Sequence, residues 1–129
     1  MSNTLVDELL SANELVISSP MYNFGVPSPL KSYFDHVVRA GRTFARNERG
    51  YVGLLADRRA YLLTARGGRT APDSPDDFQT PWIRAILAFI GITEVEHVAL
   101  EGMALDESTR ERSTELAKWQ VHRIFAGSE

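Results

Sequence analysis

The sequence predicts an α/β fold in which a parallel sheet carries helices on its faces. Three short apolar runs of strand length alternate with longer stretches whose apolar residues recur at helical spacing. This alternation is typical of a parallel sheet with right-handed crossovers. The predicted strands are Leu15–Ser18, Ala60–Thr64 and Glu94–Leu100. At 129 residues, without a linker or an internal repeat, the chain is expected to form a single domain over residues 1–129.

Two helices are predicted in the first third of the chain. Residues Ser2–Leu10 have apolar side chains at helical spacing and precede the first strand. The next helix is expected over Pro29–Gly41, because Ser28 can cap a helix and proline suits its first position. Gly41 is expected to end this helix in a left-handed conformation. Its buried face would consist of Leu30, Tyr33, Phe34, Val37 and Val38.

Two further helices follow the second and third strands. Thr80 is expected to cap the first of them, Pro81 to start it and Gly91 to close it. The last helix is expected over about Asp106–Ala126. The buried side chains would be Trp82, Ile83, Ile86, Phe89 and Ile90 in the first of these helices, and Ala117, Val121, Ile124 and Phe125 in the last.

The composition excludes several classes of protein. The chain has no cysteine, so it has neither disulfides nor thiolate ligands for a metal. A net charge of −3 argues against general binding of nucleic acid. No apolar run approaches the ~20 residues that span a bilayer, and Met1 is followed by polar residues rather than by a signal segment. We therefore expect a cytoplasmic protein that binds neither nucleic acid nor a membrane.

The segment Arg42–Tyr51 is polar and basic. Its charges could meet a phosphate of a pyridine nucleotide or of nucleic acid, but a solvated, mobile loop is the favoured interpretation. The apolar residues Val52–Leu55 that follow are expected to form a turn of helix. The basic side chains in and beside this segment are Arg39, Arg42, Arg46 and Arg49.

The side chains present exclude several reactions. A serine hydrolase needs a nucleophile, a base and a group that orients the base, and the sequence has neither a G-x-S-x-G elbow nor an obvious serine partner for a histidine. Zinc-ligand spacings, a Walker loop and a G-x-G-x-x-G motif are also missing. The acidic pair Asp76–Asp77 in the polar loop Arg69–Gln79 lacks a third ligand, so it is expected to be loop surface and no metal site is predicted. The histidines are expected to be structural or surface residues, and they are His36, His97 and His122.

Two loops at the carboxyl ends of predicted strands have the chemistry of a ligand site. Met21–Phe24 offers a thioether, two aromatic rings and an amide, which suit a flat ligand. Ala65–Gly68 has paired glycines that permit close backbone approach and leave N–H groups free to point at a ligand, but from these residues alone a plain glycine-rich turn is the favoured interpretation. In open α/β sheets ligands bind at this edge.

These loops belong to a wider resemblance. The sequence reads P-M-Y-N-F at Pro20–Phe24, P-S-P-L-K-S-Y-F-D-H-V-V-R-A-G-R-T-F at Pro27–Phe44, A-R-G-G at Ala65–Gly68 and F-I-G-I-T-E-V-E-H-V-A-L-E-G at Phe89–Gly102. In this order it resembles the FMN-dependent NADH:quinone reductases and azoreductases, which have often been labelled acyl-carrier-protein phosphodiesterases. The resemblance runs from about Leu5 to the last helix, and it implies a flavodoxin-like, doubly wound parallel sheet.

The resemblance implies that FMN carries the chemistry and that no side chain is itself catalytic. Hydride from NADH or NADPH would pass to the flavin and then reduce a quinone or an azo compound. Phe89 would lie near the substrate face of the flavin, across the interface of a homodimer. Family members commonly have serine in place of Ala65 and an aromatic residue in place of Arg46. The cofactor-binding residues implied are Met21, Tyr22, Asn23, Phe24, Arg66, Gly67 and Gly68.

The resemblance begins just before the third strand of the family's sheet. Family members first have a strand and a serine-rich loop that leads into a helix and holds the FMN phosphate, so only the last three βα units are expected here. The alternative to a reductase is a flavin-free, non-catalytic module for interaction or dimerisation. Because Leu15–Ser18 would be an unpaired apolar edge, we expect a homodimer or larger species, either family-like or joined edge to edge.

Overall fold

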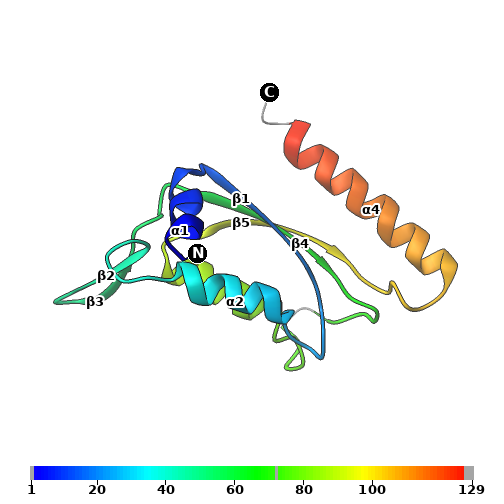
Figure 1. Ribbon diagram of the computed structural model, residues 1–129. Helices are drawn as coiled ribbons and strands as arrows, with labels where there is room; N and C mark the ends of the chain where they lie inside the picture. Colours follow the sequence, from blue (N-terminus) through cyan, green and yellow to red (C-terminus); the bar gives the residue numbers. More distant parts are fainter. Residues whose placement is uncertain (1, 72, 127–129) are drawn as a thin grey trace.

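The computed structural model describes residues 2–71 and 73–126, and its centre is a three-stranded parallel sheet (Figure 1). The strands are β1 (Glu14–Pro20), β4 (Arg59–Ala65) and β5 (Glu94–Leu100), in the order β1-β4-β5. Each predicted apolar run is therefore a strand, and β4 is the central one, with Leu62 opposite Ile17. The α/β class predicted from the sequence is confirmed.

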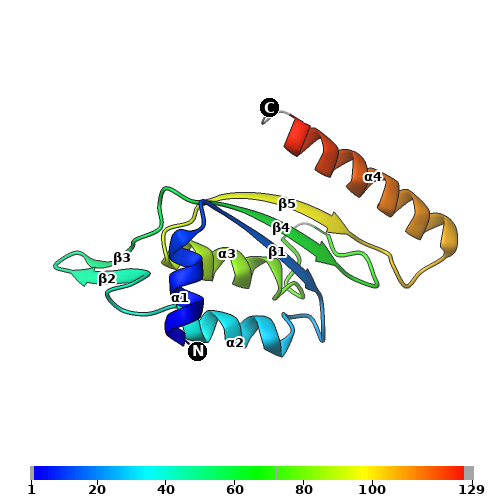
Figure 2. The same cartoon turned by 45° about the horizontal axis from the view of Figure 1, so that its top comes forward.

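Helices cover both faces of the sheet. Figure 2 shows α1 (Ser2–Ser11), α2 (Ser28–Val37) and α3 (Thr80–Phe89) below it and α4 (Glu107–Ala126) above it. The main core lies between the sheet and the first three helices, because alternate residues of β1 and β4 point to that side. Its fully or nearly fully buried members include Val6, Leu9, Leu15, Ile17, Phe34, Val37, Ala60, Leu62, Ile83, Leu87 and Ile90.

The prediction for the end of α2 is wrong. The helix ends at Val37, and Val38 has an extended backbone. Buried Thr43 causes this early end, because its hydroxyl donates to the carbonyl of Val37 (2.8 Å) and accepts the N–H of Arg39 (2.9 Å). Gly41 does have a positive φ of 80°, but it lies in the turn beyond the helix.

The basic segment is a hairpin, not a mobile loop. Strands β2 (Phe44–Asn47) and β3 (Gly50–Gly53) pair antiparallel and project from the body of the molecule (Figures 1 and 2). The helical turn expected over Val52–Leu55 is therefore also wrong. Ahead of the hairpin, Arg42 pairs with Asp7 and Arg39 donates to Asn3, both on α1; within the hairpin, Arg46 lies over the ring of Tyr51.

The face toward α4 is covered incompletely. The helix packs against β5, but of the side chains predicted to be buried only Ala117 is buried. Phe125 is 40% exposed, although its ring contacts that of Tyr61 at 4.7 Å between centroids. Leu116 and Trp119 are also exposed.

Gly53 is where the hairpin meets the body. A Cβ atom at this position would lie 2.0 Å from the backbone nitrogen of Gly91 and 2.2 Å from the carbonyl carbon of Ile90. We expect Gly53→Ala to lower the free energy of unfolding in urea by about 1–3 kcal/mol, the usual range for overpacking. Gly68→Ala is the matched control, because no atom lies within 4 Å of a Cβ there. Equal stability of the two variants would show that Gly53 does not hold this close contact.

Candidate functional site

Three loops meet at the carboxyl end of the sheet, one after each strand. The loop after β1 is joined to β4 by a hydrogen bond from the Met21 N–H to the Ala65 carbonyl (2.7 Å). The loop after β4 is joined to the third loop, because the Gly67 and Gly68 carbonyls accept N–H groups from Ala104 and Gly102. The two predicted ligand loops are therefore side by side, as the parallel order requires.

The first loop contains a strained turn. Tyr22 and Gly25 exchange two backbone hydrogen bonds, and Asn23 and Phe24 between them have φ values of 49° and 69°. This is the pattern of a type I′ turn, in which a phenylalanine is unusual. Such backbone strain costs of the order of 1–3 kcal/mol per residue and is concentrated at functional sites. A hydrogen bond from the Phe78 N–H to the Phe24 carbonyl (2.9 Å) holds the turn in place.

Both loops present unused backbone donors. In the part of the chain that the structure describes, no acceptor is found for the N–H groups of Asn23, Phe24, Gly67 or Gly68. The space above Gly68 is open. Backbone donors beside open space suit the nitrogen and oxygen edge of a planar heterocycle. A ligand-binding role for the glycine pair, which the family resemblance implies, stays a prediction.

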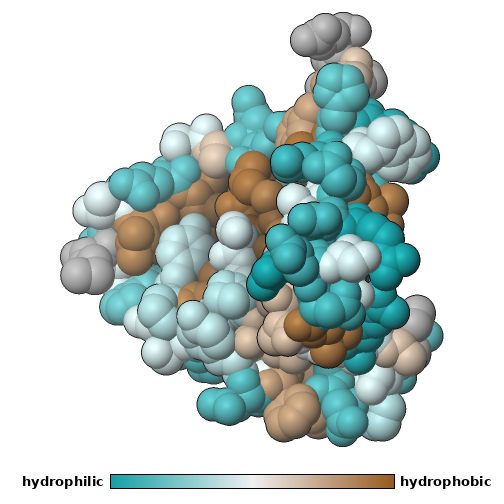
Figure 3. Space-filling model, turned by 90° about the vertical axis from the view of Figure 1, so that its right-hand side faces the viewer, coloured by the Kyte–Doolittle hydropathy of each residue, from teal (hydrophilic) through white to brown (hydrophobic). Residues whose placement is uncertain are grey.

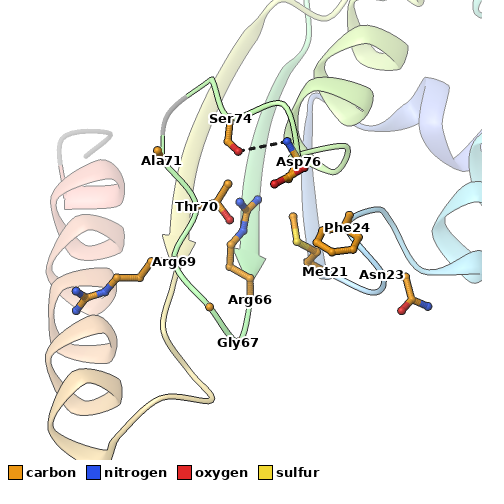
Figure 4. A pocket seen from close by; sticks show the side chains of 11 residues that line it. Met21, Asn23, Phe24, Arg66, Gly67, Arg69, Thr70, Ala71, Ser74 and Asp76 are labelled. Carbon is orange, nitrogen blue, oxygen red and sulfur yellow. Dashed lines mark hydrogen bonds between the residues drawn. The ribbon is translucent and has the colours of Figure 1, made fainter.

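A cleft of about 480 Å³ lies between these loops and the segment that follows Gly68 (Figure 4). The side chains of Met21 and Phe24 point toward Arg66, whereas those of Asn23 and Arg69 point away from it. Of the predicted cofactor-binding residues, all but Tyr22 line the cleft. The thioether and the aromatic ring of Phe24, which is 61% exposed, can cover a flat ring.

Arg66 is buried, and its guanidinium is held by side chains rather than free in the cleft. Nη2 donates to Gln79 Oε1 (2.9 Å) and to Asp77 Oδ2 (3.3 Å), and Nη1 lies 3.8 Å from Glu101. Gln79, itself fully buried, donates from Nε2 to the Ser19 carbonyl (3.0 Å). Arg66 Nε has no partner among the described residues. This network ties the ends of β1, β4 and β5 to the start of α3.

Sequence reasoning missed the role of Asp77 and Gln79. Asp77 is not loop surface: its carboxylate pairs with Arg66 and accepts the N–H groups of Gln79 (3.0 Å) and Thr80 (3.1 Å). Asp77 thus caps α3, and the prediction that the Thr80 hydroxyl does so is wrong. An aspartate three residues before the helix was the available signal, but Thr80 is the more usual cap when followed by proline.

His97 lies near this network. Its Nε2 atom is 2.8 Å from the Thr64 hydroxyl. Burial, assisted by the charges of Arg84 and Arg66, lowers the pKa of His97. His36 does have a serine neighbour, with Nδ1 2.5 Å from Ser2 Oγ, although none was expected. No carboxylate among the described residues bonds to His36, so this pair is not a triad.

Phe89 does not lie with the other predicted residues. It is at the end of α3 farthest from the loops, where its ring packs on Phe44 (4.8 Å between centroids) and Tyr51 (5.5 Å) of the hairpin. One chain therefore cannot bring Phe89 to its own cleft. Across residues 2–71 and 73–126 there is no cluster of three metal-binding side chains. None of the helices described is long and apolar enough to cross a membrane.

A family model described as "Flavodoxin-like fold" matches residues 1–123. The chain belongs to this family. An azoreductase from Bacillus anthracis str. Sterne has a TM-score of 0.88 and 27% identity to the chain, over 95% of the chain and 60% of that structure. An FMN-dependent NADH-azoreductase from Bacillus anthracis str. Ames Ancestor, solved in complex with FMN, has a TM-score of 0.83 and 31% identity, over 95% of the chain and 61% of that structure.

Curated relatives carry the family name that the sequence motifs predict. FMN-dependent NADH:quinone oxidoreductase 2 from Pseudomonas fluorescens (strain Pf0-1) is 47% identical over 95% of the chain and 61% of that protein. FMN-dependent NADH:quinone oxidoreductase from Nostoc sp. (strain PCC 7120) is 43% identical over 98% of the chain and 63% of that protein. The resemblance is confirmed, and the chain spans about three fifths of the length of these relatives. The roles of the individual site residues stay a prediction.

Substitutions in the two loops test the cleft of this flavodoxin-like chain. Asn23→Ala should weaken flavin binding only modestly, because the Asn23 side chain points away and the backbone donors remain. Gly68→Val should weaken it much more, because a branched side chain would fill the open space above Gly68. Titration of flavin fluorescence with each variant measures the effect. Ala85→Val, an exposed position on α3, is the control, and equally negligible effects of both site variants would show that these loops do not bind flavin.

A pH titration of stability tests the surroundings of His97. Its pKa is lowered in the folded state, so near and below an ordinary value of about 6.5 the unfolded chain binds more protons than the folded chain. The free energy of unfolding should therefore fall as the pH decreases from about 7 to about 5. His97→Gln should flatten this dependence, whereas exposed His122→Gln should not. Identical slopes for the wild type and His97→Gln would contradict the assignment.

Proposed function

We propose that this chain is the flavin-ring-binding part of an FMN-dependent NAD(P)H oxidoreductase that reduces quinones or azo compounds by two-electron hydride transfer. The observation that carries the proposal is the cleft in which Met21 and Phe24 face a glycine loop with free backbone donors. The names of its relatives support FMN as cofactor and NADH as electron donor. We also propose the cytoplasm as its location, which agrees with a sequence free of cysteine.

The residues of the cleft fit a flavin. When bound, FMN supplies the capacity to accept a hydride and pass on two electrons. Met21 and Phe24 would cover the ring and exclude water from it. The N–H groups of Gly67 and Gly68 would donate to its polar edge and stabilise negative charge there. The bonds that hold Arg66 in place keep these donors fixed, so little reorganisation is needed when charge develops.

The proposed substrate site requires a second copy of the chain. Phe89 lies at the opposite end of the molecule from the cleft, so it can approach a flavin only across an interface. The hairpin next to Phe89 exposes apolar side chains suited to such an interface, namely Tyr51, Val52 and Leu54. We propose a homodimer in which Phe89 of each copy contributes to the quinone or azo pocket of the other.

A flavin-free interaction module remains the second candidate, because the cleft has little to offer a phosphate. Arg66 is already paired with Asp77, and Arg69 points away from the cleft. No other cation lines the cleft among the residues that the structure describes. Compared with a site that makes three charge-assisted hydrogen bonds to the FMN phosphate, a site without them binds FMN more weakly by of the order of 5 kcal/mol.

Flavin titrations distinguish the two candidates. We expect the chain to purify largely colourless and to bind FMN and riboflavin with similar, weak affinity, because contacts to the ring are the ones retained. Fluorescence quenching of each flavin measures the two Kd values, and the relative from Pseudomonas fluorescens (strain Pf0-1) is the positive control for FMN. Failure to bind either flavin at millimolar concentration would favour the non-catalytic module. A yellow preparation with stoichiometric FMN would contradict the weak site.

A further inference from the structure

The side of the hairpin that packs on Phe89 carries one arginine among aromatic rings. Side chains alternate across a strand, so Phe44 and Arg46 of β2 lie on the same face of the hairpin. Tyr51 of β3 is paired directly with Arg46 and therefore shares this face. Phe89 packs on both Phe44 and Tyr51, with 4.8 and 5.5 Å between ring centroids. The register thus places Arg46 on the side that Phe89 occupies, and these residues together form the hairpin face.

The positive charge of Arg46 is not compensated. Its side chain is exposed, and the guanidinium carbon lies 5.7 Å from the centroid of the Tyr51 ring, within the range of a cation–π contact. Glu48 is the only acidic residue between positions 39 and 54, and among the described residues neither Arg46 nor Glu48 makes an ion pair. The hairpin face therefore combines an unpaired cation with the Tyr51 ring, which is 62% exposed.

A second contact between an arginine and a ring lies on α4. The guanidinium carbon of Arg123 is 5.0 Å from the centroid of the Trp119 ring. Figure 3 shows this side of the molecule, which is turned away from the hairpin and has both hydrophilic and hydrophobic residues along the column that leads up to the C-terminus. Within the described chain no second ring packs on Trp119. A flat molecule would contact one ring there, but several rings at the hairpin face.

We propose that Arg46 makes the acceptor pocket select flat aromatic molecules that carry an anionic substituent, such as a sulfonate or a carboxylate. The inference rests on the proposed function, in which Phe89 of each copy contributes to the quinone or azo pocket of the other. Because Tyr51 packs on Phe89, the same pocket receives Tyr51 and Arg46. The aromatic part of the acceptor lies against the rings, and its anionic group accepts hydrogen bonds from the guanidinium.

The surroundings of Arg46 set the size of the preference. A planar guanidinium can donate two parallel hydrogen bonds to an anionic group. An ion pair in open water contributes little, but here a ring covers one side of the guanidinium and the bound acceptor would cover another. We expect a preference of about tenfold for a charged acceptor over an uncharged acceptor of the same shape, the lower end for a hydrogen bond to a charged group.

A binding experiment without flavin tests Arg46, because every residue of the hairpin face belongs to one chain. Para-(phenylazo)benzenesulfonate and the matching uncharged sulfonamide have nearly the same shape, and NMR titration of the full chain measures a Kd for each. The sulfonate should bind more tightly and shift the amide signals of Arg46 and Tyr51. Arg46→Gln should abolish the preference, whereas Arg46→Lys should keep part of it. Arg123→Gln removes an equal charge from the contact on α4 and should leave the preference unchanged.

Reduction kinetics test the same preference in the assembled pocket. With NADH and excess FMN, kcat/KM for the sulfonate should exceed that for the sulfonamide about tenfold. Arg46→Gln should remove this difference without lowering kcat/KM for the sulfonamide. If neither compound is reduced, the proposed function fails, and the NMR titration alone decides whether Arg46 selects anions. The inference is overturned if the two compounds bind with equal Kd, if the preference in binding or in reduction survives Arg46→Gln, or if Arg123→Gln removes it as well.

Discussion

The buried charge of Arg66 is the constraint on which the carboxyl end of the sheet depends. The guanidinium of buried Arg66 needs acceptors for its hydrogens, and here Asp77 and Gln79 accept from Nη2, although Nε has no partner among the described residues. Asp77 in turn caps α3, and Gln79 reaches Ser19 at the end of β1. One buried cation thereby fixes the ends of the strands and the start of a helix, and so the width of the cleft between the two ligand loops.

This arrangement changes the role that the family resemblance implies for Arg66. From the sequence, Arg66 is one of the cofactor-binding residues implied by the family resemblance. In the structure it acts on the cleft mainly through other residues, because its side-chain partners are Asp77, Gln79 and Thr80. Gly67 and Gly68, which follow Arg66, then present their backbone N–H groups to the ligand. Buried support of this kind is what keeps surface loops in a single geometry.

The sequence was sufficient where periodicity determines the structure. The three strands, the helix that Gly91 closes and the position of the ligand loops all follow from apolar spacing and parallel connections. The sequence pattern was insufficient where a single side chain determines the local backbone structure. Thr43 ends α2 through two hydrogen bonds, and no pattern marks that competition. The hairpin was missed because its aromatic packing on Phe89 comes from a distant segment. The I′ turn at Asn23–Phe24 was missed because phenylalanine rarely adopts a positive φ.

The incomplete contact of α4 has a consequence for local unfolding. The helix shares little of the main core and is joined to the sheet through β5, the ring contact of Phe125 with Tyr61 of β4, and a hydrogen bond from the Ser113 hydroxyl to the Glu101 carbonyl (2.6 Å). We therefore expect it to detach as a separate cooperative unit at a lower free energy than global unfolding. The loop that leads into α4 donates to the carbonyls of Gly67 and Gly68. Each detachment of the helix would thus loosen one wall of the cleft, while the three-helix core stays folded.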